Sequence, residues 1–527
     1  MKEEWLPAEH GTDNRGLRKR VERGLVWTIA DTWGRQLLSL VVFIVIARLV
    51  SQADVGLVAL AAVFVTLAEI FVDQGLSDAI VQRRALSRGH IDTAFWISML
   101  VGVVLALAGV LLAIPISLLV GEPELQPILQ VLSVSFVLTA LSSVQMGLLR
   151  RELAFRSLAL RTLMATGGGG LVGVALAFMG YGAWALVGQA LAQAALSVVA
   201  LWRVSPWRPG LKVSGQHFRD LFGFSRNVVA ADVLTFLSRY TDNFLIGAFI
   251  GTVPLGIYAV GFRILSATSS ALLGISRRVG FSALSRLQHD RERMQRAFYK
   301  LSRLMGVIVI PGYLGLALVA PELIVVLFGE RWQAAGPVAA LLFLAGPVIG
   351  IQNVFHALLN AAGQPAVVFR LRLFSTIGNV AGFAIAVAIF FDILAVAAAF
   401  VLRAYLVMPL YFSWGRRHAG VSAREFLVQL RGIMGATAAM SVAVLAVRLA
   451  LGEVLGPATL LAVQVLAGAI AFGVALWLLD RKLLGELRET GVSALPLPGR
   501  ARHRRGRGAD DEPAARAASA EGRDGDA

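Results

Sequence analysis

The sequence predicts an all-α protein that crosses a membrane many times. Of its 527 residues, 57% are hydrophobic and only 16% are charged, which is too apolar a composition for a soluble protein of this length. Apolar stretches recur at about the 20 residues that a helix needs to span a bilayer. There is also a repeat, because Gly56 and Ala59 return 200 residues later as Gly256 and Ala259. We therefore expect two related halves.

The apolar stretches predict about fourteen transmembrane helices. Their expected limits are 24–48, 54–80, 93–118, 126–148, 158–179, 182–202, 222–249, 255–279, 299–319, 336–359, 366–390, 393–414, 432–450 and 457–479. A segment rich in proline and glycine follows the sixth stretch and predicts a linker between the halves. From Val492 onward the chain lacks periodicity and is rich in proline, glycine, alanine and charge, so we expect a disordered tail.

The placement of the basic residues predicts the orientation. Most of the 49 lysines and arginines lie in the termini and in alternate loops, whereas the other set of loops holds only Arg48, Arg331 and Arg448. Cytoplasmic loops carry such an excess of positive charge, so both termini are expected in the cytoplasm. The net charge of +16 then reflects orientation, and no nucleic-acid partner is expected. The chain has no cysteine, which excludes disulfides and thiolate metal sites.

Four arginines lie well inside predicted spans: Arg35, Arg239, Arg263 and Arg403. Three of them are about ten residues from a span end, which at about 1.5 Å per residue is near the middle of a hydrocarbon core of about 30 Å. An arginine at that depth costs at least ~2.5–3.5 kcal/mol on insertion scales. We therefore expect the four arginines to line a cavity or to pair with acids.

Other polar residues within the spans recur at helical spacing and predict a hydrated central cleft. The further residues expected to line it are Asp31, Glu69, Asp73, Asp232, Asp242, Asn353, His356 and Asn360. Two readings stay open for the acids, because Asp31 with Arg35 and Arg239 with Asp242 could be ion pairs that only neutralise each other. An arginine with spare donors grips phosphate well, which favours an anionic ligand.

Three titratable residues within the spans could either couple transport to an ion or serve only in helix packing. His356 could titrate near neutral pH and couple transport to protons, or could be a hydrogen-bonded packing residue. Glu69 and Asp73 are one turn apart and could hold a cation or a proton, or could join helices by hydrogen bonds. The seven histidines show no metal-ligand spacing, and no nucleotide-binding or nucleophile motif occurs. We therefore expect that the protein binds no cofactor and is not an enzyme.

Several short motifs resemble those of one family. They are Asp54-Val55-Gly56-Leu57, Asp73-Gln74-Gly75-Leu76, His90 with Thr93-Ala94-Phe95-Trp96, Asp242-Asn243, Leu255-Gly256-Ile257-Tyr258, Ser285-Arg286-Leu287-Gln288, Ala320-Pro321, and Leu327-Phe328-Gly329 with Trp332. Their order and spacing resemble the Wzx-type polysaccharide flippases, in particular the branch that includes colanic-acid-exporter-like proteins. This family belongs to the MOP superfamily, which also holds the MATE drug exporters and the lipid II flippase MurJ.

The resemblance implies an architecture of two lobes with six helices each and a final helix pair. The expected parts are a cytoplasmic N-terminal segment over 1–23, an N-lobe over 24–203, a linker over 204–221, a C-lobe over 222–417, a helix pair over 430–480 and a cytoplasmic tail over 492–527. The implied cargo is undecaprenyl-diphosphate-linked oligosaccharide, whose diphosphate would meet the cleft arginines. The implied location is a bacterial inner membrane, where a polysaccharide polymerase or a chain-length regulator could be a partner.

Other functions would leave different marks on the sequence. A drug or cation antiporter of the same architecture should have a cleft dominated by acids, whereas arginines without acids dominate here. A membrane polymerase or ligase acting on lipid-linked glycans should have a large outer loop with catalytic residues, and the outer loops are short. A membrane scaffold without transport would leave the buried charge unexplained. The sequence therefore favours a flippase.

Overall fold

The computed structural model of the protein describes residues 14–83, 86–285, 290–481 and 483, without the side chains of 14–31, 224–227, 271–283 and 285. The chain divides into a unit over Met1–Leu479, to which the following refers, and a second unit over Asp480–Ala527. The predicted tail over 492–527 and most of the segment over 1–23 lie outside the described residues. The described chain is helical and contains no β-strand, which confirms the all-α prediction.

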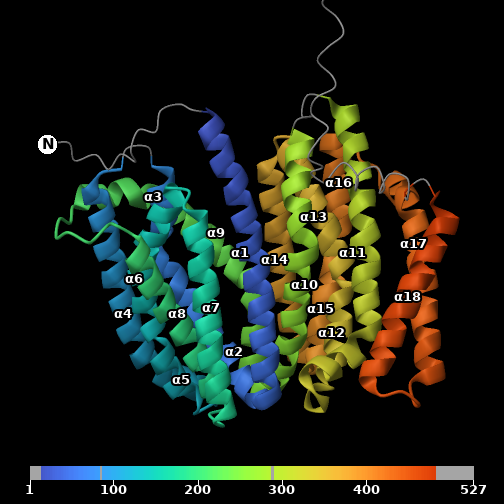
Figure 1. The fold of residues 1–527 in the computed structure, drawn as a ribbon, viewed down its shortest axis with the longest axis horizontal. Helices are drawn as coiled ribbons and strands as arrows, with labels where there is room; N and C mark the ends of the chain where they lie inside the picture. Colours follow the sequence, from blue (N-terminus) through green and yellow to red (C-terminus); the bar gives the residue numbers. More distant parts are fainter. Residues whose placement is uncertain (1–13, 84–85, 286–289, 482, 484–527) are drawn as a thin grey trace, which may run out of the picture. The chain divides into compact units, whose positions relative to one another are not determined.

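Figure 1 shows the helices of the first half, whose ends are explained by capping residues and turn residues. They are α1 (Asn14–Leu49), α2 (Gln52–Asp73), α3 (Leu76–Gln82), α4 (Arg88–Val120), α5 (Leu125–Leu132), α6 (Val134–Arg151), α7 (Phe155–Phe178) and α8 (Ala183–Val204). Ser51 and Asp54 form a capping box at the start of α2, which satisfies free backbone N–H groups there. Gln74 and Gly75, with φ of 48° and 64°, separate α2 from α3.

The helices and turns that follow the linker run from Gly215 to Leu479. The elements are α9 (Gly215–Leu245), the π-helical turn η1 (Ile246–Ile250), α10 (Thr252–Ser285), α11 (Arg291–Phe328), the 3₁₀ turn η2 (Glu330–Trp332), α12 (Ala335–Leu344), α13 (Gly346–Ala361), α14 (Pro365–Phe390), α15 (Ile393–Leu406), α16 (Met408–Ala419), α17 (Ala423–Leu451) and α18 (Pro457–Leu479). In Figure 1, α4 to α8 lie on the left, α10 to α16 on the right and α1 between them. The last pair, α17 and α18, packs on α11.

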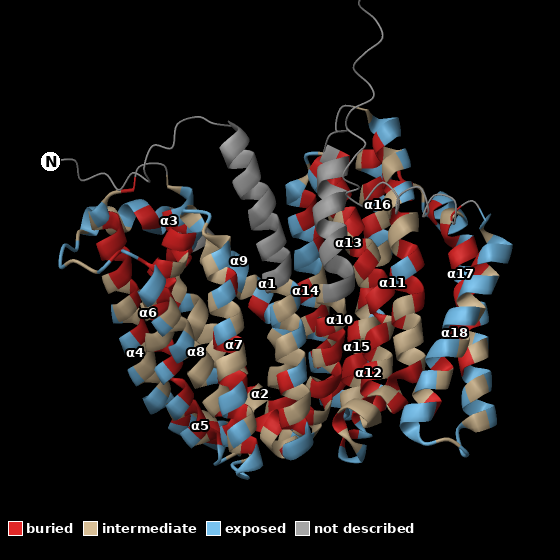
Figure 2. Cartoon of the chain, in the orientation of Figure 1, coloured by how far each residue is buried: buried red, intermediate tan, exposed pale blue. Residues whose placement is uncertain are grey.

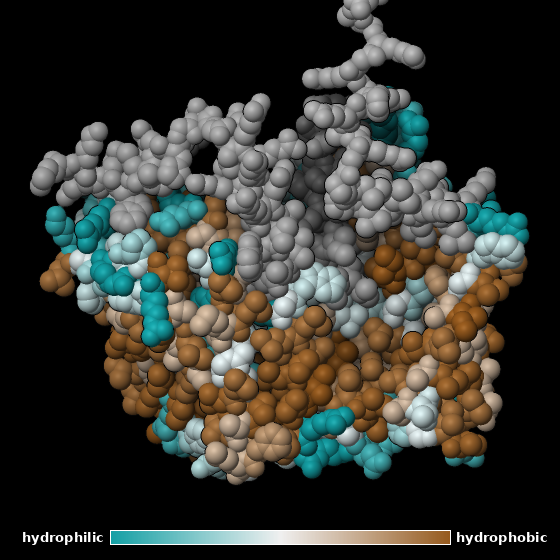
Figure 3. Space-filling model, viewed as in Figure 1, coloured by the Kyte–Doolittle hydropathy of each residue, from teal (hydrophilic) through white to brown (hydrophobic). Residues whose placement is uncertain are grey.

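The surface has the character of a membrane protein. Figure 3 shows an apolar band across the face of the molecule, with hydrophilic residues along its two edges. Among the described residues, twelve helices are long and apolar enough to cross a membrane, and a thirteenth is the pair Gly215–Gly223 and Val228–Ile250, bent by 51°. Each predicted span overlaps a helix or a bent helix pair. The multi-pass prediction is confirmed, and the number fourteen stays a prediction.

The main hydrophobic core contains buried residues from both halves, for example Leu60 of α2 and Tyr313 of α11. Buried residues gather on α10 to α13 and α15, whereas α4 and α18 show many exposed positions (Figure 2). The exposed positions are apolar, as at Leu119 and Leu449, which are both 87% exposed. Leucines so exposed would be unusual in water but are suited to contact with lipid tails.

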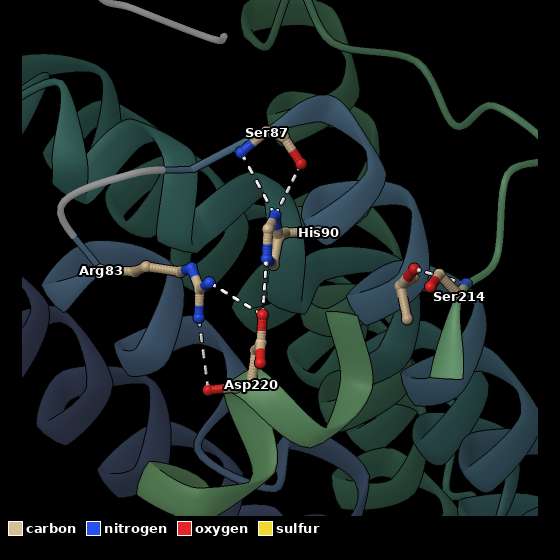
Figure 4. Close-up of polar contacts among 6 residues, drawn as sticks. Arg83, Ser87, His90, Ser214 and Asp220 are labelled. Carbon is tan, nitrogen blue, oxygen red and sulfur yellow. Dashed lines mark hydrogen bonds and ion pairs between the residues drawn. The ribbon is translucent and has the colours of Figure 1, made fainter. Parts of the chain in front are cut away.

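The linker between the halves is docked on the start of α4. Residues 205–214 connect α8 to α9, and the end of the bundle that carries them, uppermost in Figure 1, is called the linker end below. Trp96 Nε1 donates to the Gly210 carbonyl oxygen at 2.7 Å. In Figure 4, the Asp220 carboxylate lies between Arg83, whose Nη2 is 2.9 Å away, and His90, whose Nε2 is 3.4 Å away. The linker and the start of α9 are therefore hydrogen-bonded to the first half.

Candidate functional site

Arg263 lies where α1 and α10 meet. Its Nη2 donates to the Ser39 hydroxyl of α1 at 2.6 Å, and its Cζ is 5.1 Å from the centroid of the Phe43 ring. The Nε of Arg263 is buried and has no partner among the described residues. Because a guanidinium carries five N–H donors, Arg263 retains donors for a ligand.

Arg403 joins three helices of the second half. Its Nε on α15 donates to Oδ1 of Asn379 on α14 at 2.7 Å, and its Cζ lies 5.2 Å from the centroid of the Phe400 ring. The Asn379 amide in turn approaches the Ser238 carbonyl oxygen on α9 at 3.5 Å. Neither Arg403 nor Arg263 forms an ion pair with a described carboxylate. Their positive charge is therefore not neutralised by the described part of the chain.

Arg35 and Arg239 present exposed side chains. Arg35 precedes Ser39 by one turn of α1, which places it about 6 Å along the helix from the contact with Arg263. Arg239 directly follows Ser238, so it lies beside the link between α9 and α14. The side chain of Asp31 lies outside the described residues, and the predicted pair of Asp31 with Arg35 stays a prediction.

Asp242 is part of the helix packing. It is 3% exposed, and its Oδ2 accepts a hydrogen bond from the Tyr258 hydroxyl of α10 at 2.8 Å. No ion pair joins Asp242 to Arg239 among the described residues. The ion pair of these two residues, which was one of the two readings left open from the sequence, is therefore not formed in this conformation, and Asp242 instead joins α9 to α10.

The acids of α2 face hydroxyl groups of α6. Thr139 Oγ1 donates to Glu69 Oε1 at 3.3 Å, and the Ser143 hydroxyl donates to Asp73. Asp232, on α9, has an exposed side chain. Among the described residues, no three His, Cys, Asp or Glu side chains are grouped as metal ligands. The carboxylates of Glu69 and Asp73 are therefore hydrogen-bonded to hydroxyl groups within the first half.

The three candidates on α13 differ in their surroundings. His356 Nε2 lies 2.9 Å from the Tyr411 hydroxyl of α16, which matches the packing role considered from the sequence. Asn360 is exposed and Asn353 is half-buried. A role for any of the three in a cleft stays a prediction.

An apolar pocket opens beside Arg263. It has a volume of about 240 Å³ and lies between α1 and α10, where Leu37, Leu40 and Ile264 contribute to its lining. Ser39 and Arg263 directly precede two of these residues in the sequence. Arg263 and Ser39 are not themselves lining residues, but they join the same two helices that line the pocket. A cationic side chain with spare donors and an apolar pocket therefore belong to the same pair of helices, an arrangement suited to an amphiphile with an anionic head.

The end of the bundle opposite the linker end is closed by contacts between the two halves. Arg48 Nε donates to the Leu327 carbonyl oxygen at 2.7 Å, and Trp332 Nε1 donates to the Ala47 carbonyl oxygen at 2.8 Å. Gln52 donates to the Arg331 carbonyl oxygen, and Arg331 Nη1 donates to the Val50 carbonyl oxygen at 3.0 Å. These contacts join the turn between α1 and α2 to the turn after α11.

The paired glycines of the repeat lie at this same closed end. Gly56 and Gly256 bring α2 and α10 into backbone contact, because a Cβ on Gly56 would overlap the Thr252 carbonyl oxygen and a Cβ on Gly256 would overlap that of Gln52. The repeat noticed in the sequence is therefore an interface between the halves.

Three residues build this region through contacts that were not predicted from the sequence. Asn379 supports Arg403, Tyr258 holds Asp242, and Trp332 seals the closed end. Asn379 carries a signal that could have been used, because an asparagine inside the apolar span 366–390 needs a partner. Tyrosine and tryptophan carry no such signal, since both are common in apolar helices.

The comparisons with known proteins agree with this architecture. Residues 45–337 match a family model described as "Polysaccharide biosynthesis protein". The succinoglycan biosynthesis transport protein ExoT of Rhizobium meliloti is 28% identical over 69% of this chain and 74% of its own. The lipopolysaccharide biosynthesis protein WzxC of Escherichia coli is 26% identical over 68% of this chain and 74% of its own.

Solved structures show the same fold. The lipid II flippase MurJ, in an inward closed conformation, superposes with a TM-score of 0.70 at 14% identity, over 87% of this chain and 100% of its own. An inward-facing multidrug MATE transporter of the MOP superfamily superposes with a TM-score of 0.58 at 15% identity, over 73% of this chain and 94% of its own. The family model covers more than half of the sequence, which confirms the resemblance: the chain belongs to the polysaccharide biosynthesis protein family of multi-pass membrane proteins.

Proposed function

We propose that this protein is a flippase that moves undecaprenyl-diphosphate-linked oligosaccharide across the bacterial inner membrane for exopolysaccharide, capsule or O-antigen synthesis. The observation that carries the proposal is Arg263, which lies on one of the two helices that line an apolar pocket and has no carboxylate partner among the described residues. A guanidinium in a site of low dielectric binds phosphate by paired, charge-assisted hydrogen bonds.

The pocket between α1 and α10 suggests how the lipid enters. The polyprenyl chain would lie along its apolar lining, and the diphosphate would reach Arg263 and then Arg35, one turn away on α1. Arg403 and Arg239 would receive the diphosphate from the side of the second half. The sugar would occupy the more polar space next to the first half. Each part of the cargo would then meet an environment of its own polarity.

Translocation would require the two halves to change their orientation relative to each other. The N-lobe over 24–203 and the C-lobe over 222–417 would rock against each other, with the contacts of Arg48 and Trp332 broken when the closed end opens. Cargo drives such a change only by the difference in its affinity for the two states. Loss of the closed-end contacts would thus be offset by tighter contacts with the cargo in the open state.

The orientation and the partners complete the proposal. The excess of basic residues in alternate loops supports an orientation in which both termini would lie in the cytoplasm. The linker end would then be cytoplasmic, and the closed end would face outward. The helix pair over 430–480 would pack outside the lobes, and a polymerase or a chain-length regulator would receive the cargo on the outer side.

Substitution of two arginines tests the proposal in cells. Arg239→Ala and Arg263→Ala should each reduce polysaccharide export while the amount of protein in the membrane is unchanged, as measured by immunoblot of the membrane fraction. Arg370→Ala, on the exposed start of α14, serves as the matched loss of a positive charge outside the site. Full export by the double variant Arg239→Ala/Arg263→Ala would refute the role of both residues.

A further inference from the structure

A second pocket lies inside the first half, and the proposed function above does not assign it a ligand. Its volume is about 240 Å³, and its lining comes from α2, α3, α6 and α8. The lining residues are Asp73, Ser77, Leu138, Thr139, Ser142, Ser143, Met146, Arg150, Ala194 and Ser197. Hydroxyl groups therefore make up half of this lining.

The polar groups of this pocket retain hydrogen-bonding capacity. Ser77 is 4% exposed, and its hydroxyl has no partner among the described residues. An unmet buried hydroxyl costs about 1–3 kcal/mol, so a ligand that bonds to it is favoured. The Asp73 carboxylate accepts one hydrogen bond, from Ser143, although an ionised carboxylate offers about four acceptor sites.

The charge of the pocket disfavours the diphosphate. Asp73 lies in the lining, and Glu69 lies one turn away on the same helix. Arg150 also lines the pocket, but its Nη1 lies 3.4 Å from the Asp78 carboxylate. A second anion would be repelled here, whereas a neutral ligand with many O–H donors would find acceptors. Arg263 and Arg403, which have no such partner among the described residues, lie on α10 and α15 instead.

The volume selects among neutral and cationic ligands. A space of about 240 Å³ is many times the roughly 10–15 Å³ that one water molecule needs, and it is therefore far larger than a bare cation needs. It lies below the range of about 300–1,000 Å³ typical of sites for drug-sized ligands. A single sugar ring is the hydroxyl-rich ligand of intermediate size.

We infer that this pocket, defined by Asp73, Ser77 and Ser143, binds one sugar ring of the cargo. The inference rests on the proposed function for the identity of the cargo, and it assigns the sugar to the first half and the diphosphate to Arg263 and Arg403. Asp73 and Ser143 accept hydrogen bonds from sugar hydroxyls, and Ser77 supplies a hydroxyl that can donate or accept. Specificity among sugars is then a property of α2, α3, α6 and α8.

Binding of two defined lipids to the purified protein in nanodiscs tests this inference. The probes are undecaprenyl diphosphate without sugar and the same lipid carrying one glucose or one galactose. The wild-type protein should bind at least one glycosylated lipid more tightly than the bare lipid. Asp73→Asn and Ser77→Ala should each reduce this preference about tenfold, as expected for a buried hydrogen bond that is lost, and should leave the affinity for the bare lipid unchanged.

A matched control and a second pair of variants separate the two proposals. Ser98→Ala removes another buried hydroxyl without a described partner, on α4 and outside the pocket, and should keep the sugar preference. Arg263→Ala and Arg403→Ala should each reduce the binding affinity for the bare lipid and for the glycosylated lipid by the same factor. If neither substitution reduces the affinity for either lipid, the diphosphate site of the proposed function is refuted. The sugar preference can still be tested with Asp73→Asn.

Three results would overturn the sugar site. The first is a wild-type protein that binds the bare and both glycosylated lipids equally. The second is a full sugar preference in Asp73→Asn and Ser77→Ala, with thermal unfolding used to show that both variants are folded. The third is an Asp73→Asn variant that loses a dependence of binding on sodium, measured against choline, while the sugar preference remains, because the pocket would then hold a cation.

Discussion

Gly56 offers the sharpest perturbation of the interface between the halves. A Cβ at this position would overlap the backbone carbonyl oxygen of Thr252, which cannot rotate away as a flexible side chain could. Overpacking of this kind costs about 1–3 kcal/mol. Since about 1.4 kcal/mol is a factor of ten, Gly56→Ala should shift the balance away from the state with the closed end sealed by about 5- to 140-fold.

Spin labels can report this shift directly, because the protein has no native cysteine. Labels at Glu124→Cys and Gln333→Cys, both exposed positions near the closed end, would report the separation of the halves by double electron–electron resonance. The parent should give mainly short distances, and Gly56→Ala should add a population at longer distances. Gly256→Ala, the related position of the repeat, should act in the same way.

A second glycine serves as the control for this experiment. A Cβ at Gly382 on α14 would lie 3.6 Å from the Ala399 Cβ, which is an ordinary van der Waals contact. Both substitutions gain up to about 1 kcal/mol of helix propensity, so the difference between them isolates the clash. If Gly56→Ala and Gly382→Ala gave the same distances as the parent, the claim that these glycines seal the halves would be refuted.

Two further substitutions test contacts that fix the helices. Tyr258→Phe removes the donor to the buried Asp242 and should lower the midpoint of thermal unfolding, since loss of a partner to a buried group costs about 1–3 kcal/mol; an unchanged midpoint would show that the bond contributes nothing. Trp332→Phe keeps an aromatic ring but removes the donor to the Ala47 carbonyl oxygen, so it should lengthen the spin-label distances at the closed end without lowering the amount of protein in the membrane.

The helices and their membrane character could be predicted because apolar length alone determines them. Each predicted span overlaps a helix or a bent pair, and the repeat at Gly56 and Gly256 pointed to a real interface between α2 and α10. The breaks inside spans were harder to predict. The break at Gln74 requires positive φ in a residue other than glycine, and nothing in the local pattern of hydrophobicity marks it.

Side-chain partners could not be predicted from helical spacing, even within a single helix. Arg239 and Asp242 have the spacing of an ion pair, yet Asp242 bonds to Tyr258, sixteen positions later in the chain. The sequence has no acid at helical spacing from Arg263 or Arg403, and neither arginine forms an ion pair with a described carboxylate. However, the partners Ser39 and Asn379 come from other helices, and the packing of one helix against another cannot be read from periodicity.

The central claim is that this protein moves a lipid-linked oligosaccharide by means of arginines that have no acidic partner. The most direct measurement uses purified protein in vesicles loaded with undecaprenyl-diphosphate-linked oligosaccharide on one leaflet, and follows the appearance of the sugar on the other leaflet with an impermeant lectin. The account predicts translocation by the wild-type protein and a loss of at least tenfold in Arg263→Ala/Arg403→Ala. Equal translocation by this double variant and the wild-type protein, or none above empty vesicles in either, would contradict it.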